Sequence, residues 1–181
     1  MSQRKVFPIS LNLRNRNVLL IGPATHLDAR LERLQGARAQ VRMMELGEFC
    51  DSACVDVFLV MLFSAPGKGR NEAHRIAKEK GALVYVHDAP DQSDFSMPAV
   101  TARGPLQIAI STNAIAPALS RHLRECFDEL LAKSGNDLDA FIQHLANLRQ
   151  QLPTGQRGGL YDEAKRLQLD ASIRILPEDD Q

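Results

Sequence analysis

Asn17-Val18-Leu19-Leu20-Ile21-Gly22 is the stretch of sequence that decides the fold. Its apolar run ends at a glycine, which is typical of a short parallel strand that is buried on both faces. Leu27, Leu31 and Leu34 then recur at helical spacing, and residues 39–43 alternate like a second strand. Strand, glycine turn, helix and strand in this order predict a βαβ unit.

The same alternation continues along the first half of the chain. Residues 55–63 form another apolar run, residues 71–80 are expected to be helical, and residues 82–86 form a further apolar run. Strands that alternate with helices predict an α/β fold with a Rossmann-like, doubly wound parallel sheet.

Beyond residue 88 the pattern changes. Two extended segments, 95–100 and 106–110, are followed from residue 117 onward by helical patterns. We therefore expect one domain over residues 1–110 and a second, mostly helical one over residues 111–181.

The composition excludes several classes of partner. The chain has 22 basic and 22 acidic side chains, so it offers no net field to nucleic acid or to an anionic membrane, and we expect neither partner. No apolar stretch approaches the length of a membrane span, and the three cysteines are too few for a disulfide framework, which predicts a cytoplasmic protein. Cys50 and Cys54 could bind a soft metal, but no second ligand pair follows at a zinc-like spacing, so free thiols are favoured and no metal site is predicted.

The turn after the first strand, residues 22–27, has the position of a dinucleotide-binding loop but not its composition. Such a loop needs small residues, so that the backbone can approach the pyrophosphate and the helix can pack on the strand. Pro23 has no N–H to donate, and Leu27 is bulky at the packing position. Two interpretations stay open: a structural turn that binds nothing, or a helix N-terminus that still holds an anion. Glu45, at the end of the second strand, is either a ribose ligand or an exposed loop residue.

Asp88 follows the apolar run 82–86 at the place where open α/β sheets bind their ligands. A carboxylate there can take or give protons, and burial would favour its protonated form. The alternative is an aspartate that caps the turn before Pro90. If the strand persists, His87 lies on the opposite face from Asp88, which favours a structural histidine.

Several blocks of the sequence together carry a family resemblance. They are Phe7-Pro8-Ile9-Ser10-Leu11-Asn12-Leu13-Arg14, Val86-His87-Asp88-Ala89-Pro90, Asp94-Phe95-Ser96-Met97-Pro98-Ala99, Arg103-Gly104-Pro105-Leu106 and Pro117-Ala118-Leu119-Ser120-Arg121-His122-Leu123-Arg124-Glu125. The chain resembles the precorrin-2 dehydrogenase and sirohydrochlorin ferrochelatase family, the N-terminal module of siroheme synthases. The resemblance covers nearly the whole chain, and the blocks from Asp88 to Glu125 are its specific part.

The resemblance implies an NAD-binding Rossmann domain, a dimerisation region and a C-terminal helical domain, assembled as a homodimer. The chemistry that it implies is oxidation of the tetrapyrrole precorrin-2 to sirohydrochlorin with NAD, and in some members insertion of ferrous iron, as a substrate, to give siroheme. The family's essential aspartate falls on Asp88, with a role in proton transfer. The resemblance places the cofactor at Gly22, Thr25 and His26 and the tetrapyrrole at Ser111, Thr112 and Asn113, of which Thr112 matches a serine that is phosphorylated in some members.

The departures from the family pattern fall on the loops around the cofactor. A triple glycine is Gly-Pro-Ala at 22–24, a Thr-Asp element is Ser-Ala-Pro at 64–66, and a Gly-Gly pair is Asn-Ala at 113–114. The chain between Met44 and Val57 is too short for a strand that is common in the family. Each lost contact to a pyrophosphate would cost about 1–3 kcal/mol of binding free energy. Two hypotheses follow: an NAD-dependent enzyme of siroheme synthesis, or a descendant that inserts metal into a tetrapyrrole or only binds it, without hydride transfer.

Overall fold

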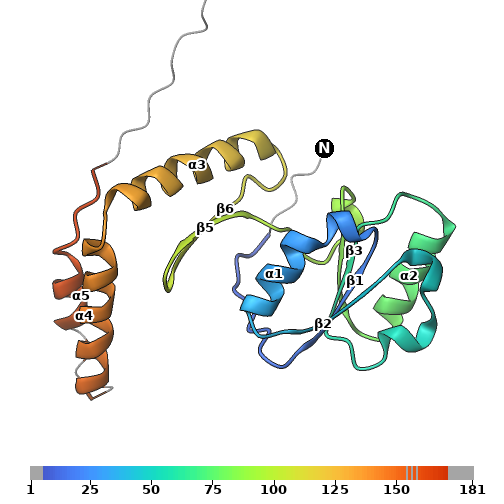
Figure 1. Ribbon diagram of the computed structural model, residues 1–181, viewed down its shortest axis with the longest axis horizontal. Helices are drawn as coiled ribbons and strands as arrows, with labels where there is room; N and C mark the ends of the chain where they lie inside the picture. Colours follow the sequence, from blue (N-terminus) through green and yellow to red (C-terminus); the bar gives the residue numbers. More distant parts are fainter. Residues whose placement is uncertain (1–5, 154, 156, 158, 171–181) are drawn as a thin grey trace, which may run out of the picture. The chain divides into compact units, whose positions relative to one another are not determined.

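The computed structural model describes residues 6–153, 155, 157 and 159–170 (Figure 1). The chain divides into two compact units, which we describe separately. The first comprises Met1–Ala99 and Ile110–Arg121, and the second comprises Val100–Ala109 and His122–Gln181.

The first unit is built on a parallel sheet of four strands. They are β1 (Asn17–Ile21), β2 (Gln40–Met44), β3 (Leu59–Leu62) and β4 (Leu83–Val86), in the spatial order β2-β1-β3-β4. Helices α1 (Asp28–Gly36) and α2 (Lys68–Glu79) cover opposite faces of the sheet (Figure 1). This arrangement confirms the predicted α/β fold with a Rossmann-like parallel sheet.

The pleat of β1 divides its side chains between two cores. Val18 and Leu20 pack on the α1 side, whereas Leu19 and Ile21 pack on the α2 side. Leu19, Leu20 and Ile21 are all 0% exposed, and full burial of one such side chain stabilises the fold by about 1.5–3 kcal/mol. The stretch that predicted the fold is therefore buried from Val18 to Ile21.

The connection from β2 to β3 contains no α-helix. It consists of two short 3₁₀ helices, η2 (Leu46–Glu48) and η3 (Asp51–Cys54). Within the part of the chain that the structure describes, no strand lies beyond β2, in line with the short spacing after Met44. The predicted strand over 55–63 is shorter than expected because Asp56 adopts a left-handed conformation (φ 56°), so the strand begins only at Leu59.

The edge strand β4 is covered by the segment that follows it. The Val84 N–H donates to Asp94 Oδ2 at 2.8 Å, and the Val86 N–H donates to Ser93 Oγ at 2.9 Å. The Asp94 N–H returns a hydrogen bond to the Val84 carbonyl at 2.8 Å. These contacts satisfy backbone groups that an open edge would leave unpaired.

The second unit contains most of a two-stranded sheet and, from His122 onward, the helices that follow it. The strands are β5 (Ala99–Arg103) and β6 (Leu106–Ile110), and the helices are α3 (Pro117–Lys133), α4 (Asp137–Gln151) and α5 (Gly159–Ala164). The helical second half was predicted. No helix among the described residues is long and apolar enough to cross a membrane.

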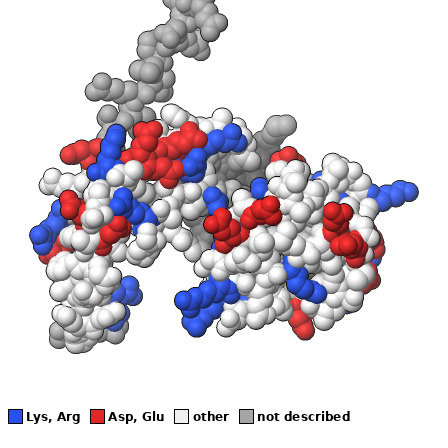
Figure 2. Space-filling model, in the orientation of Figure 1, with Lys and Arg blue, Asp and Glu red and all other residues white. Residues whose placement is uncertain are grey.

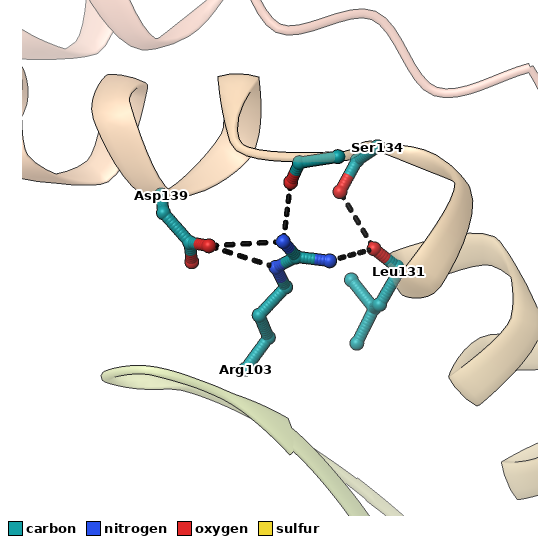
Figure 3. Close-up of polar contacts among 5 residues, drawn as sticks. Arg103, Leu131, Ser134 and Asp139 are labelled. Atoms are coloured by element: carbon teal, nitrogen blue, oxygen red, sulfur yellow. Dashed lines mark hydrogen bonds and ion pairs between the residues drawn. The ribbon is translucent and has the colours of Figure 1, made fainter.

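Arg103 fastens the sheet of this unit to the corner between α3 and α4 (Figure 3). Its guanidinium donates to the carbonyls of Leu131 and Gly135 and to Asp139 Oδ2, the last from Nε at 3.1 Å and from Nη2 at 2.9 Å. The Ser134 hydroxyl donates to the same Leu131 carbonyl at 2.6 Å. These contacts satisfy carbonyls that the end of α3 would otherwise leave without a partner.

Candidate functional site

The candidate site lies at the carboxyl ends of β1, β3 and β4, the edge at which open α/β sheets bind ligands. Gly22 follows β1, Phe63 follows β3, and the turn of His87 and Asp88 follows β4. On the visible face of each unit, basic and acidic side chains are interspersed (Figure 2), so the local chemistry rests on individual groups rather than on a field of one sign.

Gly22 is required by the protein's own packing. Its φ of 153° is one that side-chain-bearing residues rarely adopt, and an added Cβ would lie 2.9 Å from Phe63 Cβ. Its N–H donates to the Met44 carbonyl at 3.0 Å. The glycine therefore lets β1 and β3 approach closely, and its N–H is already engaged.

The rest of the loop forms hydrogen bonds between its own backbone groups. Ala24–His26 form a 3₁₀ helix, η1, in which the His26 N–H donates to the Pro23 carbonyl and the Leu27 N–H to the Ala24 carbonyl, both at 2.9 Å. Pro23 has no N–H, and Asp28 places a carboxylate in the first turn of α1. Thr25 and His26 are exposed, so the loop offers their side chains but few backbone donors to a pyrophosphate.

A cavity of about 240 Å³ lies beside this loop. It is lined by Gly22, Pro23, Glu45, Leu46, Gly47, Ser64 and Ala65. Glu45 thus lines the cavity, as a ribose ligand would, but its carboxylate also accepts from the backbone of Glu48 in a capping box around η2. Both interpretations of this residue have a basis in the structure.

Asp88 stands open to solvent. Its side chain is 90% exposed, and its carboxylate accepts no hydrogen bond from the described part of the chain, so the alternative of a turn cap has no hydrogen bond to support it, and burial does not favour the protonated form. Its φ of 55° lies in the left-handed region, which non-glycine residues adopt at a cost and mainly at functional or tight turns. The turn therefore exposes the Asp88 carboxylate to solvent and forms no hydrogen bond with it among the described residues.

His87 does not lie on the opposite face from Asp88, as the sequence suggested. Strand β4 ends at Val86, and the turn brings His87 Nε2 to 3.6 Å from Asp88 Oδ2. The other ring nitrogen, Nδ1, is buried without a hydrogen-bond partner among the described residues. The alternation of side chains holds only while a strand persists, and here it stops one residue too early.

An aromatic cluster, which we define as Phe63, Tyr85, His87 and Phe95, forms the wall beside Asp88. Ring centroids lie 5.8 Å apart for Phe63 and Tyr85, 5.5 Å for Phe63 and His87, and 5.7 Å for Tyr85 and Phe95. The guanidinium of Arg30, from α1, lies 4.5 Å above the Phe63 ring. Sequence reasoning missed Tyr85, although the spacing of Tyr85 and His87 in an extended segment could have placed both on one face.

The pKa of Tyr85 depends on its burial and on two charges around the site. Burial raises the pKa of its phenol above the ordinary value, Arg30 lowers this pKa, and Asp88 raises it. The phenol is therefore neutral at physiological pH and lies within electrostatic reach of both charges.

Arg70 ties the turn after β4 to the loop after β3. It is only 7% exposed, and its guanidinium donates to the Ser64 carbonyl at 3.5 Å and to Gln92 Oε1 at 3.4 Å. His74 Nε2 lies 2.9 Å from the Gln92 carbonyl. These contacts from α2 fix the loop beyond Asp88.

The predicted substrate residues form one turn before α3. Thr112 Oγ1 accepts from the Ala116 N–H at 3.1 Å and lies 3.1 Å from Ser120 Oγ, and the Asn113 N–H donates to Ser111 Oγ at 3.2 Å. Asn113 has a positive φ of 53°. The Thr112 hydroxyl is thus engaged in the turn itself, and the assignment of these three residues to the tetrapyrrole stays a prediction.

Comparisons with known proteins give a consistent picture. Residues 103–127 match the family model described as sirohaem biosynthesis protein central. Siroheme synthase from Nitrosococcus oceani is 26% identical over 93% of this chain and 40% of its own length, and siroheme synthase from Actinobacillus succinogenes is 31% identical over 69% of this chain and 30% of its own length. The chain thus spans less than half the length of these curated relatives.

A solved structure shares the fold. SirC, precorrin-2 dehydrogenase, superposes with a TM-score of 0.69 over 90% of each chain, at 17% sequence identity.

Proposed function

The chain belongs to the siroheme-biosynthesis family that includes the siroheme synthases, and on this premise we propose that it acts on a tetrapyrrole by inserting ferrous iron into sirohydrochlorin. The observation that carries the proposal is Asp88: an acid that follows a strand end, in a left-handed turn, whose carboxylate accepts no hydrogen bond from the described residues and lies 3.6 Å from His87 Nε2. Insertion of Fe²⁺ into the macrocycle releases the two pyrrole N–H protons. Asp88 is the group we assign to accept one of these protons, and the other passes to water.

The NAD-dependent step that the family resemblance implies is not supported by the loop after β1. NAD would need backbone donors for its pyrophosphate and a glycine at the second position of the loop. In this chain Pro23 has no N–H, the His26 and Leu27 N–H groups are engaged within η1, and Ala24 adds a methyl group where the phosphates would pass. The residues present do not fit the cofactor, so we derive no hydride transfer through it.

A protein that binds the tetrapyrrole without turnover is the second candidate. The exposure of Asp88 favours it, because an acid in open water lacks the excluded environment that strengthens catalytic electrostatics. The same experiment separates the two candidates.

The test measures anaerobic insertion of ferrous iron into sirohydrochlorin by the change in its absorption spectrum. We expect Asp88→Asn, which tolerates the left-handed turn, to lower the rate by about 10²–10⁴-fold while the affinity for the tetrapyrrole is unchanged. Asp91→Asn, an exposed acid three residues away in η4 (Pro90–Gln92), is the control and should match wild type. Full-rate insertion by Asp88→Asn would remove Asp88 from this role, and tetrapyrrole binding with no insertion by any variant would favour the second candidate.

Calorimetric titration with NAD tests the cofactor separately. We expect binding weaker than micromolar, and micromolar affinity would contradict our account of the loop. Thr25 and His26 as cofactor residues, and Ser111, Thr112 and Asn113 as tetrapyrrole residues, remain predictions that alanine substitution in the two binding assays can test.

We also propose that the chain forms a homodimer and that its folding domains are residues 1–110 and 111–181. Both follow from the family resemblance and the change of pattern in the sequence. Sedimentation equilibrium tests the dimer, and limited proteolysis tests the domain limits.

A further inference from the structure

Arg30 carries a charge that the described part of the protein does not neutralise. Its Nη1 donates to the His26 carbonyl at 3.0 Å, its Nε is buried without a partner, and it forms no ion pair with a described carboxylate. A guanidinium has five donors arranged in a planar fork, so most of its donors are left for another acceptor. A partly buried cation without an anion is costly, and an anionic ligand would offset that cost.

The position of this charge is fixed by Phe63. The guanidinium lies 4.5 Å above the ring, and stacking of this kind holds the fork in one orientation. Phe63 is 4% exposed and follows β3, so the support is rigid. Arg30 therefore differs from a mobile surface arginine, whose ordering on binding would cost side-chain entropy.

Arg30 also lies on the Asp88 side of the sheet edge. The Phe63 ring beneath it contacts His87, whose Nε2 is 3.6 Å from Asp88. Arg30 and Asp88 both act on the phenol of Tyr85. A cation, a neutral hydroxyl and an acid thus come from α1, β4 and the turn after β4 to one site.

We propose that the stacked Arg30 guanidinium is an anion-binding group that anchors a carboxylate of the ligand beside Asp88. This inference rests on the proposed function for its ligand, because precorrin-2 and sirohydrochlorin carry acetate and propionate groups around a flat macrocycle. A planar carboxylate matches the guanidinium fork, and one anchored side chain would orient the ring relative to Asp88. A phosphate has the same chemistry, so the dinucleotide is the competing source of the anion.

The test titrates the full chain with sirohydrochlorin, followed by the absorption of the macrocycle. We expect Arg30→Gln to weaken binding by about tenfold to a hundredfold, the loss typical of a charge-assisted hydrogen bond, and Arg30→Lys to lose less. Arg33→Gln is the matched control, because Arg33 is an exposed arginine on the same helix. Thermal unfolding of each variant verifies that the fold is retained.

Three outcomes would overturn the inference: wild-type affinity in Arg30→Gln, equal weakening by Arg33→Gln, or an Arg30-dependent loss confined to NAD and inorganic phosphate. A parallel titration with tricarballylate, a small tricarboxylate, separates this inference from the proposed function. If tricarballylate binds in an Arg30-dependent way and sirohydrochlorin does not bind, the proposed tetrapyrrole function is wrong and the anion site is supported. Binding of sirohydrochlorin that ignores Arg30 would sink the site alone.

Discussion

Two turns leave the same edge of one sheet, and they use their residues in opposite ways. The turn after β1 directs its glycine and several N–H groups inward: Gly22 admits Phe63, and the N–H groups of His26 and Leu27 close η1. The turn after β4 directs its acid outward, with Asp88 in a left-handed conformation and 90% exposed. The turn after β1 thus uses these groups for packing and for hydrogen bonds within the loop, while the turn after β4 leaves its carboxylate exposed to solvent.

Substitution of Gly22 is the strongest way to break this comparison. Gly22→Ala combines an unfavourable φ with a 2.9 Å approach to Phe63 Cβ, and we expect it to lower the free energy of unfolding by about 2–5 kcal/mol. Denaturant unfolding measures the loss. Gly47→Ala is the control, because Gly47 lines the same cavity, and an added Cβ there would meet no atom within 4 Å. A loss below about 0.5 kcal/mol for Gly22→Ala, the range of ordinary surface changes, would mean that Gly22 is not a packing residue.

Substitution of Asp94, which supports the turn after β4, should lower the free energy of unfolding by less than substitution of Gly22. Burial by itself raises the pKa of Asp94, but the hydrogen bonds from Lys78 at 2.6 Å and from the Val84 N–H outweigh it and hold this pKa below its ordinary range. Asp94→Ala leaves the Val84 N–H without this acceptor, and we expect a loss of about 1–3 kcal/mol in the free energy of unfolding. Asp91→Ala, an exposed acid nearby, should change little.

The pH dependence of Asp94 has a definite sign. Because its pKa is lower in the folded state, its stabilising contribution is complete above the unfolded-state value of about 3.9 and is lost as the pH falls through the folded-state pKa. The difference in stability between wild type and Asp94→Ala should therefore narrow in acid. A difference that stays constant down to the acid-unfolded range would argue against this role.

Particular residues show how far the sequence could predict this site. The strand over 17–21 and the acid after β4 follow from apolar runs and their ends, which are local properties. The contact between His87 and Asp88 does not follow from local sequence. It depends on a left-handed backbone at Asp88, and an aspartate in the sequence does not by itself indicate that conformation. The stacking of Arg30 on Phe63 joins residues 33 positions apart, from α1 and the end of β3, and no periodicity connects them.

Partial restoration of the first turn would sharpen the comparison. Pro23→Gly returns one backbone donor to the loop, and we expect the affinity for NAD to rise by about tenfold, the value of one hydrogen bond to a charged group. Ala24→Gly returns space without a new donor and is the control. Recovery of micromolar binding in Pro23→Gly would show that the proline alone excludes the cofactor, and equal gains in both variants would assign the defect to space rather than to donors.

The smallest expected effect is on the titration of Tyr85, which tests whether Arg30 and Asp88 act on the same hydroxyl. Tyr85 and Tyr161 are the two tyrosines of the chain, so a Tyr161→Phe background leaves the ultraviolet phenolate signal to Tyr85. Since Arg30 lowers the pKa of Tyr85 and Asp88 raises it, Arg30→Gln should move the phenol titration to higher pH and Asp88→Asn to lower pH. Each change should be small, because charge pairs that are partly exposed to water interact weakly. If the titration of Tyr85 moves in opposite directions in the two variants, both charges lie near its hydroxyl. If Arg30→Gln leaves the titration unchanged, Arg30 does not act on the site of Asp88.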